Sequence, residues 1–237
     1  MAPISYLEGN GINRKILSTS MRATVVNWIV NVHKKFRLKQ ETLFLAVNIV
    51  DRFLATTQVA KDKLTLVAAT SLLVASKFED QWAPLLRDLV YVGSNSFTAK
   101  EVRDMERTML NALQFQISVP TVFPFLARAT KAAQLGSTQQ KLASYIAEVA
   151  VHNHEVIKQP PSVIAASAVA LALRMAKVGS WSEACHTATG YSESELYPCM
   201  QLMNGMIKAL PAEVKSVRNK YTGSAMGNAS TVRAVEL

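Results

Sequence analysis

Residues 62–80, DKLTLVAATSLLVASKFED, decide the fold, because this stretch carries no charge from Leu64 to Ser76 and shows no polar face. A helix with such a pattern must be buried on all sides. Thirteen uncharged residues that rise about 1.5 Å each reach only ~20 Å, whereas a membrane span needs roughly twenty apolar residues. The stretch therefore predicts a central core helix, with Asp62 as its N-cap and other helices packed around it.

Charged and aromatic residues return at the end of this helix, in Lys77-Phe78-Glu79-Asp80. A buried helix that reaches the surface with a cation, an aromatic ring and two acids is a natural place for a binding site. The two carboxylates could be taken for a catalytic pair, but solvation of a helix end explains Glu79 and Asp80 better.

The composition is that of a packed globular protein. Of 237 residues, 49% are hydrophobic and only 18% are charged, which suits one large or two modest domains. Cys185 and Cys199 have no dense spacing pattern, and no apolar segment follows a basic start, so we expect the cytosol or nucleus and buried free thiols. The net charge of +9 would suit an anionic partner, but the cations are scattered, so charge alone selects none and nucleic acid is disfavoured.

Apolar residues recur at helical spacing on both sides of the central stretch, and no segment alternates as a strand would. The spacing predicts helices over 21–36, 40–56 and 85–92, and one more that opens at the capping box Thr98 to Glu101. The sequence therefore predicts an all-α fold.

The second half of the chain repeats the plan of the first. An aromatic-Ser/Thr-x-x-Glu motif occurs at 97–101 and again at 191–195, and residues 160–173 form a second charge-free stretch. Matched helix positions follow the two motifs: Val102 with Leu196, Met105 with Cys199, Met109 with Met203, and Leu113 with Ile207. This self-similarity predicts two tandem five-helix repeats, each around a central buried helix.

The predicted domains follow from these repeats. The boundaries are a lead-in over 1–20, a first repeat over 21–115, a second over 120–210, and a C-terminal helix with a mobile tail over 211–237. The tail prediction rests on residues 223–237, which lack a packing pattern.

Several of these stretches, in order, resemble the cyclin box and its C-terminal partner repeat. They are 21–54, 64–80, 97–115, 160–173, 190–200 and 217–221. The resemblance covers roughly residues 15–222, and KFRLKQETLFLAVNIVDRF with PTVFPFLARATKAA is most similar to the B-type, mitotic members. It implies two stacked cyclin repeats.

Cyclins are activating subunits of cyclin-dependent protein kinases, so the resemblance implies a non-catalytic regulatory subunit that controls mitotic entry. It places Lys77 and Glu106 where side chains grip the backbone around the kinase's regulatory helix, beside Glu79. It places Phe78, Leu110, Phe115 and Ile117 in the apolar seat of that helix. The less favoured alternative is that Lys77 and Glu106 form only a solvated ion pair.

Arg22 and Asp51 each lie among apolar neighbours, where an unpaired charge would be costly. The resemblance implies that they pair and lock the first helix to the second. The alternative is that both face water.

A further stripe on the first helix follows the spacing i, i+3, i+4, i+7 and could simply be core. It consists of Met21, Thr24, Val25 and Trp28. In cyclins this stripe docks substrates or inhibitors that carry an Arg-x-Leu motif. Thr24, Asn31 and Thr65 depart from the residues that are usual in the family, so we expect ordinary Arg-x-Leu docking to be weakened.

Other motifs carry less information. Residues 14–17 fit a loose destruction signal, although a helix lead-in is favoured. His152 and His154 lie on different helix faces and Cys185-His186 has no third member, so we expect no metal and no cofactor.

Two alternative functions remain open at this point. One is a B-type general transcription factor, which also stacks two cyclin-like repeats and binds DNA, and the other is a transcription-type cyclin. For a cyclin we expect the nucleus and cytoplasm, and no membrane.

Overall fold

The computed structural model describes Asn13 and residues 17–237, and within these it contains helices and no strand. The chain forms two units that meet in sequence between Val119 and Pro120. The first contains α1 (Thr19–Phe36), α2 (Gln40–Thr56), α3 (Leu64–Glu79), α4 (Leu86–Val92) and α5 (Ala99–Ala112). The second contains α6 (Val122–Ala132), α7 (Ser137–Ala150), α8 (Pro161–Ala176), α9 (Glu183–Thr189), α10 (Glu193–Ala209) and α11 (Lys215–Lys220). The prediction of an all-α fold with two tandem repeats is confirmed.

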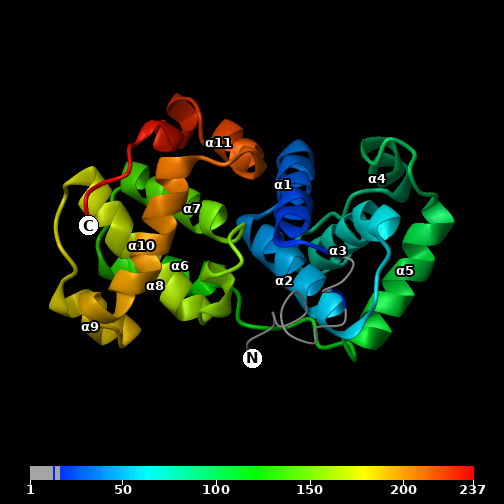
Figure 1. Cartoon of the computed structure of the whole chain (residues 1–237), viewed down its shortest axis with the longest axis horizontal. Coiled ribbons are helices and arrows are strands. Elements are labelled where there is room, and N and C mark those ends of the chain that lie inside the picture. The colour runs from blue at the N-terminus through cyan, green and yellow to red at the C-terminus, as the bar shows by residue number, and fades with distance from the viewer. Residues whose placement is uncertain (1–12, 14–16) are drawn as a thin grey trace. The chain divides into compact units, whose positions relative to one another are not determined.

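Helix α3 is the core of the first unit and packs against α1, α2 and α5 (Figure 1). Leu64 and every residue from Leu66 to Ser76 are buried, as a helix without a polar face requires. Because neighbours cover α3 on all sides, only its last turn is free to present charged side chains.

The prediction that Asp62 caps α3 is wrong. Asp62 lies inside a short 3-10 helix, Lys61–Lys63, and the residue before α3 makes no side-chain cap bond. The backbone N–H of Leu64 donates to the carbonyl of Lys61, so the 3-10 turn leads directly into α3 and supplies a partner for the start of the helix.

Helix α8 has the same place in the second unit, where it packs against α6, α7 and α10 (Figure 1). It opens with Pro161 at a first-turn position, and residues 164–173 are buried. The matched positions of the two repeats are buried in both units, except that Met105 is half-buried where Cys199 is buried.

Both predicted capping boxes are present. Thr98 and Glu101 close the first turn of α5, and Ser192 and Glu195 close that of α10. The pKa of Glu101 is lowered from 4.5 to about 2, first because the backbone N–H of Thr98 donates to its carboxylate, and then through Lys63 and the Thr98 hydroxyl.

This lowered pKa predicts a pH dependence of stability. The pKa of Glu101 in the folded chain lies below its usual value, so its stabilising effect is present above about pH 4.5 and is lost as the pH falls toward about 2. In Glu101→Gln we therefore expect the melting temperature to fall less than in the parent chain over this range. Glu195→Gln is the matched variant, because the pKa of Glu195 is lowered by the equivalent bonds to Ser192. The melting temperature is measured by circular dichroism at each pH. If it falls by the same amount in the parent chain and in both variants, the prediction is contradicted.

The end of the chain is fastened to the second unit by a buried carboxylate. Glu148 of α7 is fully buried, and its Oε1 accepts hydrogen bonds from Lys220 Nζ at 2.7 Å and from the Tyr221 hydroxyl at 2.8 Å. Burial, together with this carboxylate, raises the pKa of Tyr221. The contact holds α11 against α7.

Beyond α11 the structure differs from the predicted mobile tail. The residues that follow form two 3-10 helices, Ser224–Met226 and Ala229–Thr231. The Asn204 side chain donates to the carbonyl of Val235 at 2.6 Å and accepts from its N–H at 3.1 Å. A sequence pattern contains no signal for such a contact, because the side chain of Asn204 bonds the backbone N–H and carbonyl of a residue 31 positions away.

The predicted lead-in over 1–20 lies largely outside the described residues, as does most of the loose destruction signal at 14–17. Asn13 is described and is fully buried. Its side-chain amide donates to the carbonyls of Leu54 and Thr57, and its oxygen accepts from the N–H of Val59. Asn13 thus satisfies backbone groups at the C-terminal end of α2.

Candidate functional site

Lys77 and Glu106 form an ion pair between the last turn of α3 and the middle of α5. Lys77 Nζ lies 2.7 Å from Oε1 and 2.9 Å from Oε2 of Glu106. The Lys77 side chain is 51% exposed and that of Glu106 is 17% exposed. Because the Lys77 side chain is open to solvent, the pair contributes less than about 1 kcal/mol to folding.

Apolar side chains lie on the same two helices and just beyond α5. Phe78, the neighbour of Lys77, is 53% exposed, and Phe115, just beyond α5, is 67% exposed. Leu110 is half-buried, whereas Ile117 is only 7% exposed and lies beneath the surface. Of the residues predicted for the seat, Ile117 is therefore buried, whereas the two phenylalanines are open to solvent.

The turn that carries Phe115 has an unusual backbone. Gln114 and Phe115 have φ values of 51° and 56°, in the left-handed region that bulky side chains rarely adopt. Hydrogen bonds from Phe115 N–H to the carbonyl of Leu110 and from Ile117 N–H to that of Phe115 hold the turn. Such a conformation costs about 1–3 kcal/mol, and it also ends other helices of this chain, for example at Arg37 and Lys177.

Glu79 and Asp80 connect the end of α3 to the start of α2. The Asp80 carboxylate accepts hydrogen bonds from the backbone N–H of Lys39 at 3.0 Å and from the Thr42 hydroxyl at 2.6 Å, and Lys39 Nζ donates to the carbonyl of Glu79 at 2.7 Å. Asp80 is therefore a structural connector rather than the solvated helix end that we expected. Burial, followed by the charge of Glu41, raises the pKa of Glu79.

Sequence reasoning missed three exposed apolar side chains in the segment that follows α3. Trp82 is 81% exposed, Leu85 53% and Tyr91 72%. Their neighbours Ala83, Leu86 and Val90 pack against the core, whereas these three side chains face solvent. A large aromatic residue directly after the core helix was the available signal, since contiguous exposed apolar surface marks interaction sites.

The predicted docking residues lie on α1 and at the start of α3. Val25 is buried, Met21, Trp28 and Thr65 are half-buried, and Thr24 and Asn31 are exposed. Trp28 packs against the core cluster that includes Leu66 and Leu89. The Thr24 hydroxyl donates to the carbonyl of Ser20 at 3.0 Å, which satisfies its hydrogen atom within the helix.

Arg22 and Asp51 lie together between α1 and α2. The Nε and NH2 groups of Arg22 each donate to one carboxylate oxygen of Asp51 at 2.7 Å. The two side chains are 1% and 5% exposed. The pair is a buried connection between α1 and α2, since solvent cannot reach either charge.

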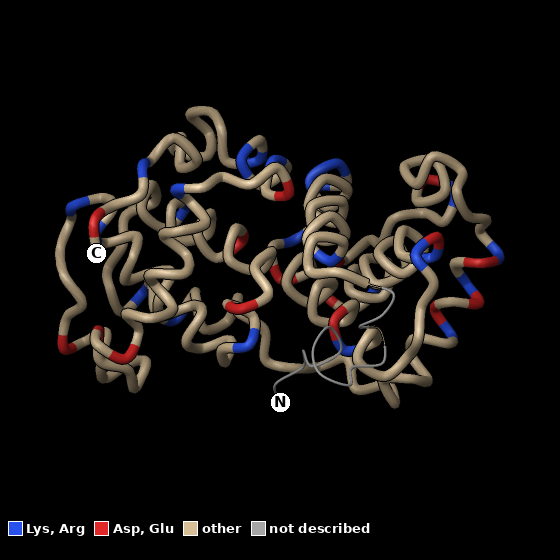
Figure 2. Tube along the Cα trace, in the orientation of Figure 1, with Lys and Arg blue, Asp and Glu red and all other residues tan. Residues whose placement is uncertain are grey.

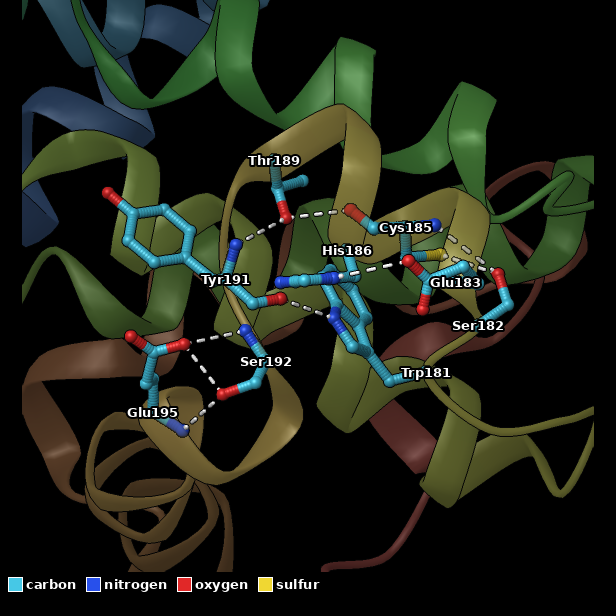
Figure 3. A network of polar contacts seen from close by, with 9 residues as sticks. All are labelled: Trp181, Ser182, Glu183, Cys185, His186, Thr189, Tyr191, Ser192 and Glu195. Atoms are coloured by element: carbon cyan, nitrogen blue, oxygen red, sulfur yellow. Dashed lines mark hydrogen bonds and ion pairs between the residues drawn. The ribbon is translucent and has the colours of Figure 1, made fainter.

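Cys185 and His186 belong to a structural network around α9 (Figure 3). Ser182 caps α9, and Trp181 Nε1 donates to the carbonyl of Tyr191 at 2.8 Å. His186 Nδ1 lies 3.4 Å from Glu183 Oε1 on the exposed side, whereas Cys185 is fully buried. These bonds shape the connection from α9 to α10 and leave the thiol inaccessible.

The described residues contain neither a candidate metal cluster nor a helix suited to span a membrane. No group of three or more His, Cys, Asp or Glu side chains there could hold a metal ion. In the same part of the chain, none of the helices combines the length and the hydropathy of a bilayer span.

Comparison with known families gives two matches that together cover nearly the whole chain. Residues 5–118 match the family model described as cyclin, N-terminal domain, and residues 120–234 match that described as cyclin, C-terminal domain.

Two curated relatives carry B-type cyclin names. A G2/mitotic-specific cyclin-B of Patella vulgata is 37% identical over 229 residues, which are 96% of this chain and 55% of the relative. Cyclin-B2-2 of Arabidopsis thaliana is 40% identical over 217 residues, 91% of this chain and 51% of the relative. The chain thus spans about half the length of these relatives.

Solved structures share the fold at lower identity. A viral cyclin from herpesvirus saimiri aligns with a TM-score of 0.74 at 18% identity, over 87% of this chain and 89% of that one. A chain of the yeast RNA Pol II CTD kinase CTDK-1 complex aligns with a TM-score of 0.66 at 15% identity, over 95% and 82% of the two chains.

Proposed function

Because the chain belongs to the cyclin family, we propose that it is a regulatory subunit that binds and activates a cyclin-dependent protein kinase and acts at mitotic entry. The G2/mitotic names of its relatives support the timing. The chain itself carries out no catalysis. It acts by a population shift, because it binds the kinase with the regulatory helix turned inward better than the kinase in other states.

One observation carries the proposal: Lys77, Phe78 and Glu106 lie at the surface of the first unit, where Lys77 and Glu106 are in contact. A cation and an acid next to an exposed ring suit a partner helix, since they offer hydrogen bonds to backbone groups and an apolar seat. Phe115, on its strained turn, extends this seat.

A second surface of the first unit, on α1 and the start of α3, is proposed to bind peptides. The docking patch, which consists of Met21, Thr24, Val25, Trp28, Asn31 and Thr65, recruits segments of substrates or inhibitors. The nucleus and cytoplasm are the proposed locations. The transcription-factor and transcription-type alternatives are not favoured, since the relatives at 37–40% identity carry B-type names.

The test is direct stimulation of a kinase. The purified chain is mixed with candidate cyclin-dependent kinases, and histone phosphorylation is measured as the chain is titrated. We expect saturable stimulation of at least one kinase, and none from the chain alone. DNA binding with steep salt dependence, without stimulation of any kinase, would contradict the proposal.

A further inference from the structure

The solvent-facing stripe of α1 continues beyond the docking patch to Lys35. Thr24, Trp28, Asn31 and Lys35 follow one another at spacings of four, three and four, so they share one helix face. Trp28 is half-buried and supplies an apolar floor, while the other three side chains are exposed. The stripe therefore runs from an apolar floor through a neutral amide to a cation.

Lys35 is held in place by an aromatic ring of α4. Its Nζ lies 5.1 Å from the centroid of the Tyr91 ring, and Tyr91 is 72% exposed. A cation over the face of a ring is attracted by the quadrupole of the ring. Tyr91 thus positions the charge at the end of the stripe and leaves both groups open to a ligand.

The charge around this stripe is positive. No Asp or Glu occurs from Leu17 to Gln40, whereas Lys34 and Arg37 flank Lys35, and Figure 2 shows basic residues at the C-terminal end of α1. Acids of neighbouring elements are engaged elsewhere, since Asp88 lies 3.8 Å from Arg87 and the Asp80 carboxylate accepts hydrogen bonds from the Lys39 N–H and the Thr42 hydroxyl. An arginine in a docking peptide would meet repulsion here, and an anionic side chain would meet attraction.

We propose that the docking patch selects extended segments of substrate proteins that carry an anionic side chain, carboxylate or phosphate, and that Lys35 and Tyr91 read this side chain. This inference rests on the proposed function, because it names the ligand chemistry of the same patch. Lys35 follows Trp28 by seven residues, about 10.5 Å along the helix axis, and an extended peptide covers this in about three residues. The anionic residue therefore lies about three positions from the apolar residue that covers Trp28.

The experiment is a titration of the purified chain with fluorescent peptides by anisotropy. All peptides share one apolar residue. Each peptide carries Glu, phosphoserine, Gln or Arg three positions from it, on its N-terminal side in the first set and on its C-terminal side in the second. We expect the Glu and phosphoserine peptides to bind about fivefold more tightly than the Arg peptide in one of the two sets, and the difference to shrink as salt is added. The Glu and phosphoserine arms distinguish the two sources of negative charge.

Variants locate the effect. In Lys35→Ala the preference should disappear, and in Asn31→Asp it should shift toward the Arg peptide. Lys131→Ala removes an equal charge from an exposed position on α6 and should keep the parent preference. Equal binding of the Glu and Arg peptides by the parent chain, or an unchanged preference in Lys35→Ala, would overturn the inference. The titration needs no kinase, so its outcome is separate from that of the stimulation assay.

Discussion

We expect Glu106→Ala at the proposed interface to weaken binding of the kinase by about 2 to 5 kcal/mol, and Lys77→Ala by a similar amount. Docking removes water from the pair, so loss of one member leaves the other charged, desolvated and without its partner. The measurement is a calorimetric titration of each variant with the kinase that the chain stimulates.

Folding stability separates this effect from a general structural one. The pair is accessible, so the melting temperature of either variant should stay close to that of the parent chain. Arg103→Ala is the matched control, because Arg103 is exposed on α5 less than one turn before Glu106. Unchanged kinase affinity in Glu106→Ala, or an equal loss of kinase affinity in Arg103→Ala, would refute the assignment of Glu106 to the kinase interface.

Asp51→Ala should destabilise the first unit by about 3 to 5 kcal/mol, because it leaves the guanidinium of Arg22 buried without its carboxylate. Urea unfolding measures this change in the free energy of unfolding. The control is Asp104→Ala, which removes the 52% exposed partner of Lys100 and should cost less than about 1 kcal/mol.

A double replacement tests the cause of that loss. Arg22→Met combined with Asp51→Leu removes both buried charges, so it should recover much of the stability lost in Asp51→Ala. If Asp51→Ala costs no more than Asp104→Ala, the buried pair is not the connection between α1 and α2 that its geometry indicates.

Features that depend on neighbours along the chain could be predicted from the sequence. The bounds of α2 agree with the predicted 40–56, and both capping boxes form, because a hydroxyl and a carboxylate three residues apart meet within one helical turn. The burial of α3 followed from its lack of a polar face. These elements needed no knowledge of distant contacts.

Features that depend on distant residues could not be predicted. Asp80 found its partners on α2 about 40 residues away, and Asn204 met the end of the chain. The exposure of Trp82 and Tyr91 depends on how α4 packs, and their residue types favoured burial. For the candidate site, the sequence indicated the helix end, but the strained turn at Phe115 became visible only in the structure.

The hydrogen bonds around Asp80 affect the entropy of binding a partner at the end of α3. They fasten the C-terminal end of α3, which carries Lys77 and Phe78, to the N-terminal end of α2. A helix end would otherwise fray, and a partner would have to order it on contact. Because this helix end is already ordered, we expect the chain to lose little backbone conformational entropy when the proposed partner binds, so that the partner's helix does most of the adapting.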